Sequence, residues 1–387
     1  MFNSLSQKTP FGFFRPSGKQ RVAFIKAKGK ARGSAVVSYL SKGWTSSGKM
    51  PDARGHTNVA ECGIMVDTYR ELGLNVHLVD YNNESFEPPD DCRVVVDLHF
   101  NLERWDSSLP ESCVRVLHAT GPHWIEYNLS ELNRLRNLCD RKGVALLPRR
   151  QLPPSKGPQF ANQISAVGNA YTMDTFGFTK KPITRIPISS SYELPWPERR
   201  SFDDARRKFI WVGSFGMVQK GLDLVLDAFA GMPELELTVC GRPEKEADFF
   251  ELYKRELHDT PNIHFHGWVD MATAAFTEIG GTHASVIYPS SAEGGAGSVI
   301  HCMHAGMLPV CTTEASVDLG DFGVHVDSGT VEAVQKACRT VAQMPPGEVG
   351  ARARAAYEHV RKVHTRRMFR ENYRQFAQKI TGTVVPS

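Results

Sequence analysis

The stretch that decides the fold is YPSSAEGGAGSVIHCMHAGMLPVCT, residues 288–312. An apolar segment leads into a turn with Gly294, Gly295 and Gly297, and an apolar helix and a Pro-Val strand follow. Glycines let a ligand approach the backbone closely, and the helix that they open presents free N–H groups and a positive dipole end. This stretch therefore predicts a diphosphate site at the start of a helix in a parallel sheet.

The same alternation extends through the second half of the chain from Phe209. The predicted strands are FIWVGS, LELTVCG, NIHFHGW, ASVIYPS and LPVCTT. The predicted helices cover QKGLDLVLDAFAGM, residues 244–258, a segment before ASVIYPS, and GSVIHCMHAGM. Alternating strands and helices predict a doubly wound parallel sheet.

The first half shows a looser form of this pattern. Its predicted strands are RVAFIKA, NVHLVDY, CRVVVDLHF, VRVLHAT, ALLPRR, SAVGN and ITRIPI, and its helices cover GHTNVAECGIMVDTYRELG and LSELNRLRNLCDRKG. Residues 151–200 are rich in turn formers and are typical of a linker zone. Two tandem sheets create a cleft between the carboxyl ends of their strands, which is where we expect the active site.

Length and composition set the broad class. A chain of 387 residues suggests about two domains, and 41% hydrophobic with 23% charged residues is ordinary globular usage. No window reaches the roughly 18 apolar residues of a membrane span, and the N-terminus lacks an apolar signal core, so we expect a cytoplasmic protein. The eight cysteines form no CxxC pair and are interpreted as reduced core residues.

The net charge of +4 is unevenly distributed. In the first 54 positions the only acid is Asp52, against the basic residues Lys8, Arg15, Lys19, Arg21, Lys26, Lys28, Lys30, Arg32, Lys42, Lys49 and Arg54. Such a segment, interleaved with phenylalanines, could contact an anionic membrane at the inner face or a polyanionic acceptor. A solvated, flexible tail over residues 1–20 is an equal alternative.

Residues 288–312 resemble the signature of the retaining GT-B glycosyltransferases of family 4, also called group 1. In that family a Pro-Ser strand end is followed by a Glu, small residues, a helix that ends in Gly, and a Pro-Val strand. The matching positions here are Tyr288, Pro289, Ser290, Glu293, Gly294, Gly295, Gly306, Pro309 and Val310. The resemblance implies that Glu293 binds donor-sugar hydroxyls and that the diphosphate lies on the glycine turn; a helix cap is the alternative role of Glu293.

The segment WVGSFGMVQKGLDLVLDAF, residues 211–229, resembles the first strand, loop and helix of the family's donor domain. Lys220 is in register with the lysine that neutralises the leaving diphosphate. Ser214 stands where the family has an arginine, and Arg242 is a candidate replacement. His301 stands where the family has a second Glu that grips the ribose; neutral imidazole accepts only one hydrogen bond, so a weak ribose contact and a structural histidine remain open.

Further site residues are implied by the resemblance. On the donor side they are Gly241, Arg242, Gly267, Trp268, Val269, Ala296 and Gly297, besides those named above. On the acceptor side they are His56, Thr57, Asn58, Thr120 and Gly121. His118, at the end of a predicted strand, is placed beside the donor sugar as a catalytic residue together with Lys220 and Glu293; a buried core histidine is its alternative.

The sequence thus predicts an α/β chain with two Rossmann-like domains in the GT-B arrangement: residues 1–198, residues 199–368, and a terminal helix in 369–387 that crosses back. The expected partners are a nucleotide-sugar donor and a glycan or lipid-linked acceptor, without nucleic acid, metal or cofactor, in surface polysaccharide or glycolipid assembly. No D-x-D, G-x-S-x-G, H-E-x-x-H or P-loop motif occurs. A nucleotide-sugar epimerase and a non-catalytic glycan-binding protein are the alternatives.

Overall fold

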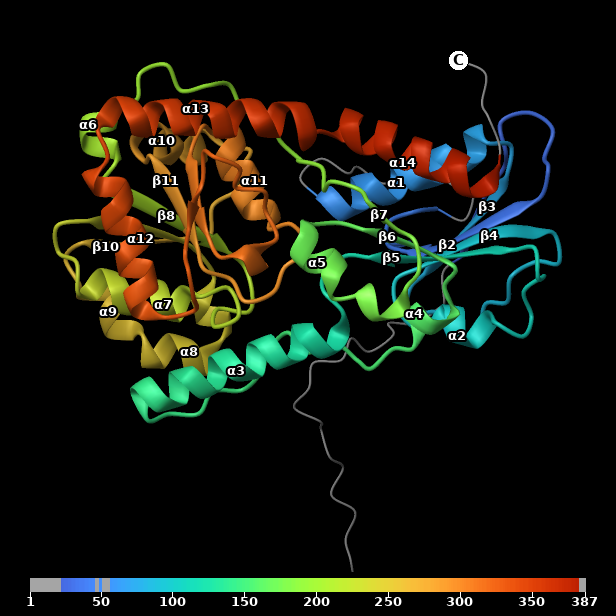
Figure 1. The fold of residues 1–387 in the computed structure, drawn as a ribbon, viewed down its shortest axis with the longest axis horizontal. Coiled ribbons are helices and arrows are strands. Elements are labelled where there is room, and N and C mark those ends of the chain that lie inside the picture. Colours follow the sequence, from blue (N-terminus) through green and yellow to red (C-terminus); the bar gives the residue numbers. More distant parts are fainter. Residues whose placement is uncertain (1–21, 46–48, 51–55, 383–387) are drawn as a thin grey trace, which may run out of the picture.

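The computed structural model describes residues 22–45, 49–50 and 56–382, which form two domains side by side (Figure 1). Each domain has a predominantly parallel sheet with helices on both faces, which confirms the predicted α/β class with two Rossmann-like domains. Five of the eleven basic residues expected at a membrane, Lys8, Arg15, Lys19, Arg21 and Arg54, lie outside the described residues.

The N-terminal sheet has seven strands in the order β1-β3-β2-β4-β5-β6-β7. Their bounds are β1 Val22–Ile25, β2 Ser34–Tyr39, β3 Asn75–Asp80, β4 Cys92–Asp97, β5 Val114–Ala119, β6 Gln163–Ala166 and β7 Ile183–Arg185. All neighbours are parallel except β1, which pairs antiparallel with β3 at the edge, Val22 lying opposite Val79. The parallel strands β2 to β6 are largely buried on both faces, as such sheets require.

Two sequence predictions in this domain were wrong. The central strand β2, with the apolar run SAVVSYL around it, was not predicted, because the basic residues on both sides hide it in a charged segment. The expected strand ALLPRR is an irregular segment, since Pro148 cannot donate to a ladder and the segment runs along the other domain instead of joining the sheet. The helices of this domain are α1 Thr57–Glu71, α2 Asn101–Trp105, α3 Trp124–Lys142, α4 Gly157–Phe160 and α5 Ala170–Asp174, with a 3-10 turn η1 Gly177–Thr179.

The C-terminal sheet has six parallel strands in the order β10-β9-β8-β11-β12-β13. Their bounds are β8 Lys208–Gly213, β9 Glu236–Gly241, β10 Ile263–Gly267, β11 Ser285–Tyr288, β12 Leu308–Cys311 and β13 Val324–His325. The order reverses between β8 and β11, the topological switch point at which open α/β sheets bind ligands.

The helices of the C-terminal half are α6 Phe202–Ala205, α7 Leu222–Ala230, α8 Ala247–Leu252, α9 Lys254–His258, α10 Ala274–Thr282, α11 Gly297–His304, α12 Val331–Gln343, α13 Pro346–Val363 and α14 Arg366–Thr381. The 3-10 turns are η2 Pro243–Lys245 and η3 Thr313–Ala315. The helix expected over 244–258 is divided at Tyr253, whose buried ring stacks on Phe249.

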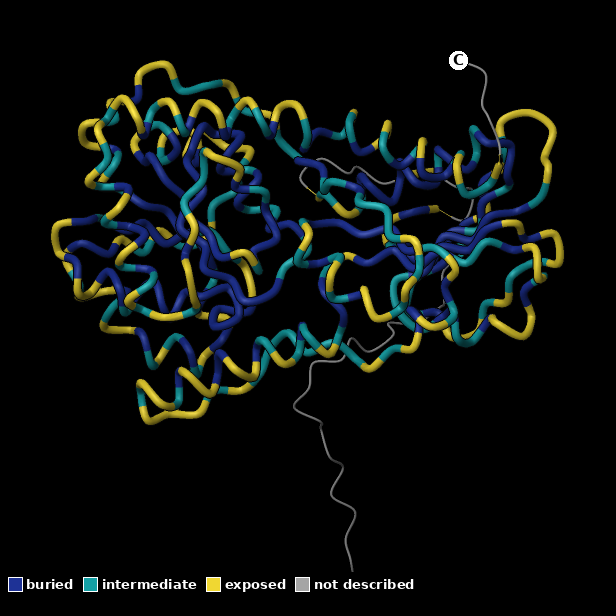
Figure 2. Tube along the Cα trace, in the orientation of Figure 1, coloured by how far each residue is buried: buried dark blue, intermediate teal, exposed yellow. Residues whose placement is uncertain are grey.

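The cores follow the two sheets, whose strands are the most deeply buried parts of the chain (Figure 2). The largest apolar cluster belongs to the C-terminal sheet, and two smaller clusters cover the faces of the N-terminal sheet. The eight cysteines are free thiols, and seven are buried in these cores. Within the described residues, no helix is long and apolar enough to cross a membrane.

Two long helical connections tie the domains together on opposite sides (Figure 1). The helix α13 leads directly into α14, which packs on α1 through Phe369, Tyr373 and Phe376 in the N-terminal core. On the opposite side α3 reaches from the first domain to the second, where Leu135 and Leu138 join its core. The two connections leave the carboxyl ends of the sheets facing each other.

The domains meet most closely at Gly294. Its backbone lies so near the Thr120 carbonyl that an added Cβ would stand 1.9 Å from that oxygen. A second contact joins Asn169 N–H to Ser316 Oγ at 3.0 Å, and Ser316 itself has φ 59°, a left-handed conformation unusual for serine. The glycine at 294 is therefore required for the domains to approach this closely.

We expect Gly294→Ala to force the domains apart, because the added methyl group would overlap a backbone atom that cannot rotate away. Overpacking of this kind destabilises by about 1–3 kcal/mol. The measurements are thermal melting and the radius of gyration by small-angle scattering, with Gly281→Ala as control, since a Cβ there meets no atom within 4 Å. An unchanged radius and melting temperature for Gly294→Ala would contradict the prediction.

Candidate functional site

A cavity of about 630 Å³ lies between the two domains. Its lining comes from the loops that follow the strands of both sheets, including Thr120 and Gly121 after β5 and Gly213 and Ser214 after β8. The glycine turn before α11 forms a third part of the wall. The cavity is thus the cleft that the sequence analysis expects.

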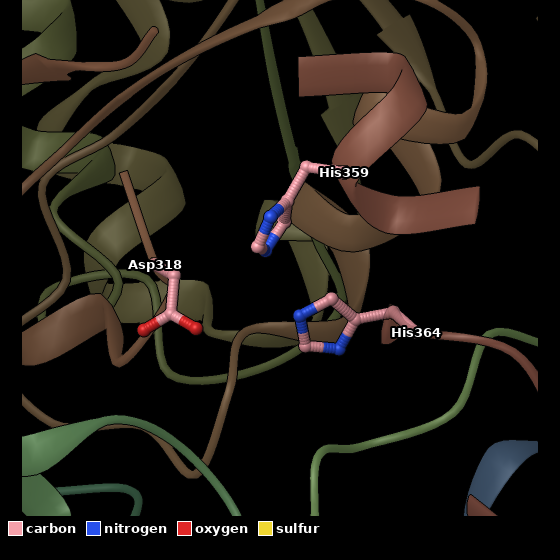
Figure 3. Close-up of side chains that lie close together, drawn as sticks. All are labelled: Asp318, His359 and His364. Atoms are coloured by element: carbon pink, nitrogen blue, oxygen red, sulfur yellow. The ribbon is translucent and has the colours of Figure 1, made fainter. Parts of the chain in front are cut away.

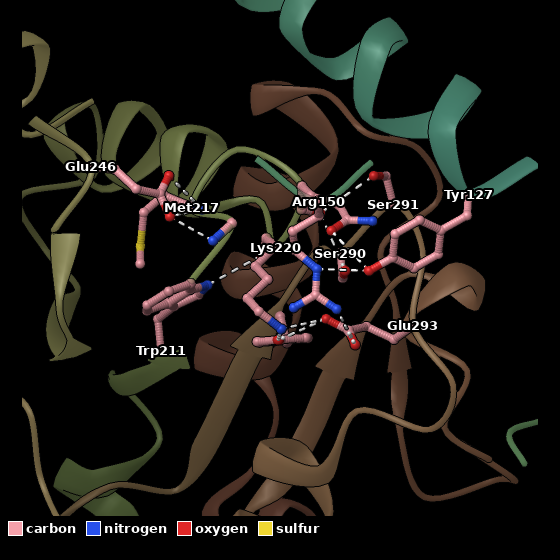
Figure 4. A network of polar contacts seen from close by, with 12 residues as sticks. Tyr127, Arg150, Trp211, Met217, Lys220, Glu246, Ser290, Ser291 and Glu293 are labelled. Atoms are coloured by element: carbon pink, nitrogen blue, oxygen red, sulfur yellow. Dashed lines mark hydrogen bonds and ion pairs between the residues drawn. The ribbon is translucent and has the colours of Figure 1, made fainter. Parts of the chain in front are cut away.

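An ion pair lies at the centre of the wall that the C-terminal domain contributes (Figure 4). Lys220 Nζ donates to Glu293 Oε1 and, at 2.8 Å, to the hydroxyl of Tyr288. The Tyr288 hydroxyl donates to the same carboxylate oxygen at 3.3 Å. Both charged side chains are nearly buried, with 10% and 12% of their surfaces exposed, so their charges interact strongly.

The loop between β8 and α7 positions Lys220 through its backbone. Gly221 adopts φ 74°, and a side chain there would collide with the Pro289 carbonyl. The Trp211 indole donates to the Lys220 carbonyl at 3.2 Å. The buried carboxylate of Glu246 accepts the N–H groups of Gly216 and Met217, which closes the loop (Figure 4). Lys220 is therefore held from several sides before any ligand arrives.

Arg150 brings a second cation to this cluster from the irregular segment after α3. Its guanidinium lies 3.8 Å from Glu293 Oε2, and its Nε donates to the Tyr127 hydroxyl at 2.7 Å. The stem of Arg150 lies over Gly216, where a Cβ would stand 2.2 Å from Arg150 Cδ. The sequence analysis missed Arg150; the only signal is the Arg149-Arg150 pair before the linker zone.

Burial and charge act in opposite directions on this cluster. Burial alone would raise the pKa of the Glu293 carboxyl, but Lys220 and Arg150 together hold it below its usual value. Burial lowers the pKa of the Lys220 ammonium, which Glu293 partly offsets. Glu293 is therefore ionised at neutral pH, and two cations converge on one carboxylate, leaving positive charge for an anion.

The glycine turn and the start of α11 form the part of the cavity suited to phosphate. Gly294, Gly295, Ala296 and Gly297 all line it, and a Cβ at Gly297 would meet nothing within 4 Å, so its face is open. Gly295 has φ 77°, which turns the chain into the helix. The first amides of a helix lack intrahelical acceptors and bind anions well.

His301 lines the cavity, but its Nε2 is already used. It accepts the backbone N–H of Ser191 at 3.0 Å, which ties α11 to the linker between the domains. Burial lowers the pKa of His301 to about 4, so the ring is neutral and Nδ1 carries the proton. A ribose contact of His301 stays a prediction and would use Nδ1 as a donor.

The structure brings many of the predicted residues to the cavity wall. Those that line it are His56, Thr57, Asn58, Thr120, Gly121, Ser214, Lys220, Trp268, Val269, Glu293, Gly294, Gly295, Ala296, Gly297 and His301. Those that do not line it are His118, Gly241, Arg242 and Gly267.

His118 lies away from the position beside the donor sugar that the resemblance implies. Its side chain is buried, bonded through Nδ1 to Ser165 Oγ at 2.8 Å, and packed edge-on against Tyr39 and Tyr373. Residues alternate between the faces of a strand, so Leu117 and Ala119 border the cavity while His118 points to the side covered by α14. The prediction for His118 is corrected to a core histidine.

Arg242 does not take the place of the arginine missing at Ser214. Its guanidinium stacks on the ring of Trp268 at 4.7 Å; Trp268 lines the cavity, whereas Arg242 does not. Gly241 has a packing role, because a Cβ there would stand 2.5 Å from the Gly213 carbonyl on the neighbouring strand. The cation that lines the cavity beside Lys220 is Arg150.

Glu61 is a titratable residue in the cavity wall that the sequence analysis did not select. It lies on the buried face of α1, and its Oε1 accepts the N–H and the hydroxyl of Ser189 at 2.7 and 2.9 Å. Burial raises the pKa of the Glu61 carboxyl to about 7 despite these bonds. The signal in the sequence is a lone acid within the apolar run VAECGIMV.

Solved structures share this architecture. Anabaena Alr3699/HepE, solved with UDP and glucose, has a TM-score of 0.56 at 12% identity over 90% of this chain and 99% of its own. WaaG, a glycosyltransferase involved in lipopolysaccharide biosynthesis, has a TM-score of 0.50 at 14% identity, and the match spans 90% of this chain and 100% of WaaG. S. aureus TarM has a TM-score of 0.48 at 12% identity, and the match spans 75% of this chain and 55% of TarM. The likeness to HepE and WaaG, at 12% and 14% identity, shows the fold alone.

Two Rossmann-like domains around a shared cavity define the GT-B fold. The family profile described as "Glycosyl transferases group 1" matches residues 206–344, a range that lies within the C-terminal half and contains both motifs that carry the resemblance. Curated protein sequences give no significant match to the chain.

We expect Glu61→Gln to change the pH dependence of stability. The folded pKa of about 7 exceeds the usual carboxyl value of 4.5, so Glu61 favours folding below pH 4.5 and loses this contribution as the pH rises through 7. The amide cannot ionise, so the variant should gain stability over the wild type between pH 5 and pH 8, on the order of 3 kcal/mol.

The measurement is urea denaturation across this pH range. Glu71→Gln on the same helix is the control, because its pairing with Lys28 lowers the carboxyl pKa, so its contribution changes only below pH 4.5 and the variant should keep the shape of the wild-type profile between pH 5 and pH 8. Parallel pH profiles for the wild type and Glu61→Gln would contradict the prediction.

Proposed function

We propose that the chain transfers a sugar from a nucleotide diphosphate sugar to an acceptor hydroxyl, with the donor in the cavity against the C-terminal domain. The observation that carries this proposal is the group of Lys220, Arg150 and Glu293 beside the open start of α11. Fixed cations and oriented amides stabilise the charge that develops on a leaving diphosphate. A sugar-binding protein without turnover has no need for such an arrangement.

In this proposal the diphosphate takes over the cations that Glu293 now holds. An incoming anion would lie between Lys220, Arg150 and the amides of the glycine turn. Glu293, released from part of its pairing, would accept hydrogen bonds from sugar hydroxyls. Arg150 replaces the arginine missing at Ser214, and its segment is held along the C-terminal domain by the bond of Arg149 to Asp248.

Retention of configuration and independence of metal are further parts of the proposal. They rest on the family resemblance and on the residues of the wall. In the described part of the chain, no group of three metal-ligating side chains lines the cavity. Lysine and arginine supply the positive charge that a divalent ion supplies in other transferases.

The acceptor should enter on the side of the N-terminal domain, near His56, Thr57, Asn58, Thr120 and Gly121. HepE was solved with UDP and WaaG is involved in lipopolysaccharide biosynthesis. A UDP-sugar donor and a surface glycan or lipid-linked acceptor are therefore the first candidates. Contact of the basic N-terminal segment with an anionic membrane remains part of the proposal.

We expect Lys220→Met to abolish most turnover and to lower stability. The lysine is buried, so its loss leaves Glu293 with the Tyr288 hydroxyl and, as its only cation, the more distant Arg150, a change of about 3–5 kcal/mol. The double variant Lys220→Met with Glu293→Gln removes both charges and should recover much of the stability but none of the turnover. The measurements are urea denaturation and release of nucleoside diphosphate.

Lys208→Met is the matched control: it removes a partly exposed ion pair with Glu236 outside the cavity, and it should change neither quantity by much. Turnover of Lys220→Met within a few-fold of the wild type would remove Lys220 from the proposed mechanism.

The proposed function itself is tested by thermal melting with UDP, GDP, ADP and the corresponding monophosphates. We expect selective stabilisation by one nucleoside diphosphate, by about 2.7 kcal/mol at a hundredfold excess over its Kd. Sugar transfer from the matching donor should persist in EDTA. Release of an epimerised free sugar without acceptor, or loss of transfer in EDTA that manganese or magnesium restores, would contradict the proposal.

A further inference from the structure

Asp318, His359 and His364 come together where the chain crosses from the second domain back to the first (Figure 3). One ligand atom of each side chain lies within 4.8 Å of the others. None of the three lines the cavity of the proposed transferase site. The sequence analysis expected no metal site.

Local structure explains how the two histidines meet. They are separated by four residues, and His359 lies in the last turns of α13. The helix ends at Val363, and His364 follows with φ −105° and ψ 56°, which turns its ring back toward the helix end. Histidines with three to five residues between them are a common pair of metal ligands. Asp318 arrives from the loop after η3.

The orientation of His364 is fixed by a carbonyl. Its Nδ1 donates to the Ile188 carbonyl at 2.8 Å, so the lone pair is on Nε2, which points into the cluster (Figure 3). A histidine that ligates a metal almost always donates its other ring N–H in this way. The side chain is 3% exposed, and Nε2 has no hydrogen-bond partner among the described residues.

His359, like His364, has a ring nitrogen that makes no hydrogen bond to the described residues. Its Nε2 is also buried and has no partner within the part of the chain that the structure describes. Two nitrogen atoms without partners then lie near a carboxylate, and a buried polar group without a partner is unfavourable. A cation in the middle would satisfy all three.

We propose that Asp318, His359 and His364 bind a divalent transition metal ion, with Zn²⁺ as the best match. Two imidazole nitrogens and one carboxylate oxygen are borderline ligands that suit zinc, and a water would complete a tetrahedron. Ligand atoms around zinc lie about 3.4 Å apart, so the side chains must close by about 1 Å, which rotation of the partly exposed Asp318 and His359 allows.

Asp318 can ligate while it keeps its existing ion pair. Its Oδ2 pairs with Arg185 at 2.5 Å, which leaves Oδ1 for a metal. The carboxylate is 29% exposed, so ions can reach the site from solvent.

The position of the site gives the metal a consequence for domain arrangement. His364 is bonded to the linker through the Ile188 carbonyl and through its own carbonyl, which accepts the Ser190 N–H at 3.1 Å. Asp318 belongs to the second domain, and its partner Arg185 ends the last strand of the first. Zinc would therefore join the α13–α14 junction, the linker and both domains, and stiffen the hinge rather than take part in chemistry.

The test is zinc binding by the full chain after dialysis against EDTA, measured by competition with a chromophoric chelator, together with thermal melting. We expect one Zn²⁺ per chain, a rise in melting temperature with zinc, and a visible absorption band when Co²⁺ is used instead. His359→Ala should weaken zinc affinity at least tenfold and remove the rise. Asp318→Asn should do the same while keeping the shape of the side chain.

His325→Ala is the matched control, because His325 is an exposed histidine of the same domain, and it should bind zinc as the wild type does. Equal zinc affinity of the wild type and His359→Ala, or a wild type whose melting temperature does not rise with zinc, would overturn the proposal. Neither result bears on the transferase site, since no measurement here depends on turnover.

Discussion

The buried pair of Lys220 and Glu293 is the interaction on which the functional half of the molecule depends. Two opposite charges at this depth are tolerated only with close partners, and both have them: Tyr288 bonds to each, and Arg150 approaches the carboxylate from the other domain. Removing either charge alone would leave an unpaired charge in a poorly solvated place. The pair therefore connects strand β11, the loop after β8 and the segment after α3.

The closed domain arrangement follows from a few close approaches. Gly294 must lack a side chain for the domains to meet at Thr120. Gly216 must also lack one, because the stem of Arg150 lies directly over it. On opposite sides of the cleft, α3 and the α13–α14 connection restrict how the domains move. The cavity, the approach of Arg150 to Glu293 and the cluster of Asp318, His359 and His364 therefore depend on the two domains together rather than on either one.

Histidine shows how context decides the role of a residue. His118, His301 and His364 are all buried, and burial lowers the pKa of each to about 4. His118 is bonded to a serine inside the core, and His301 holds the linker by accepting an amide. His364 instead has a lone pair directed at a second histidine and a carboxylate. The same chemistry supports packing, positioning or ligation, depending on what the free nitrogen faces.

The sequence by itself determined the alternation of strands and helices, the glycine turn and Lys220 in its loop, because these depend on local periodicity and on short motifs. The sequence analysis missed the strand Ser34–Tyr39, because basic residues flank its apolar run. The roles of Arg150, of Glu61 and of the cluster formed by Asp318, His359 and His364 were decided only by the tertiary structure. Their partners lie far away in the sequence: Glu293 for Arg150, Ser189 for Glu61, and Asp318 for the two hinge histidines. No local pattern encodes a contact between residues that only the packing of two domains brings together.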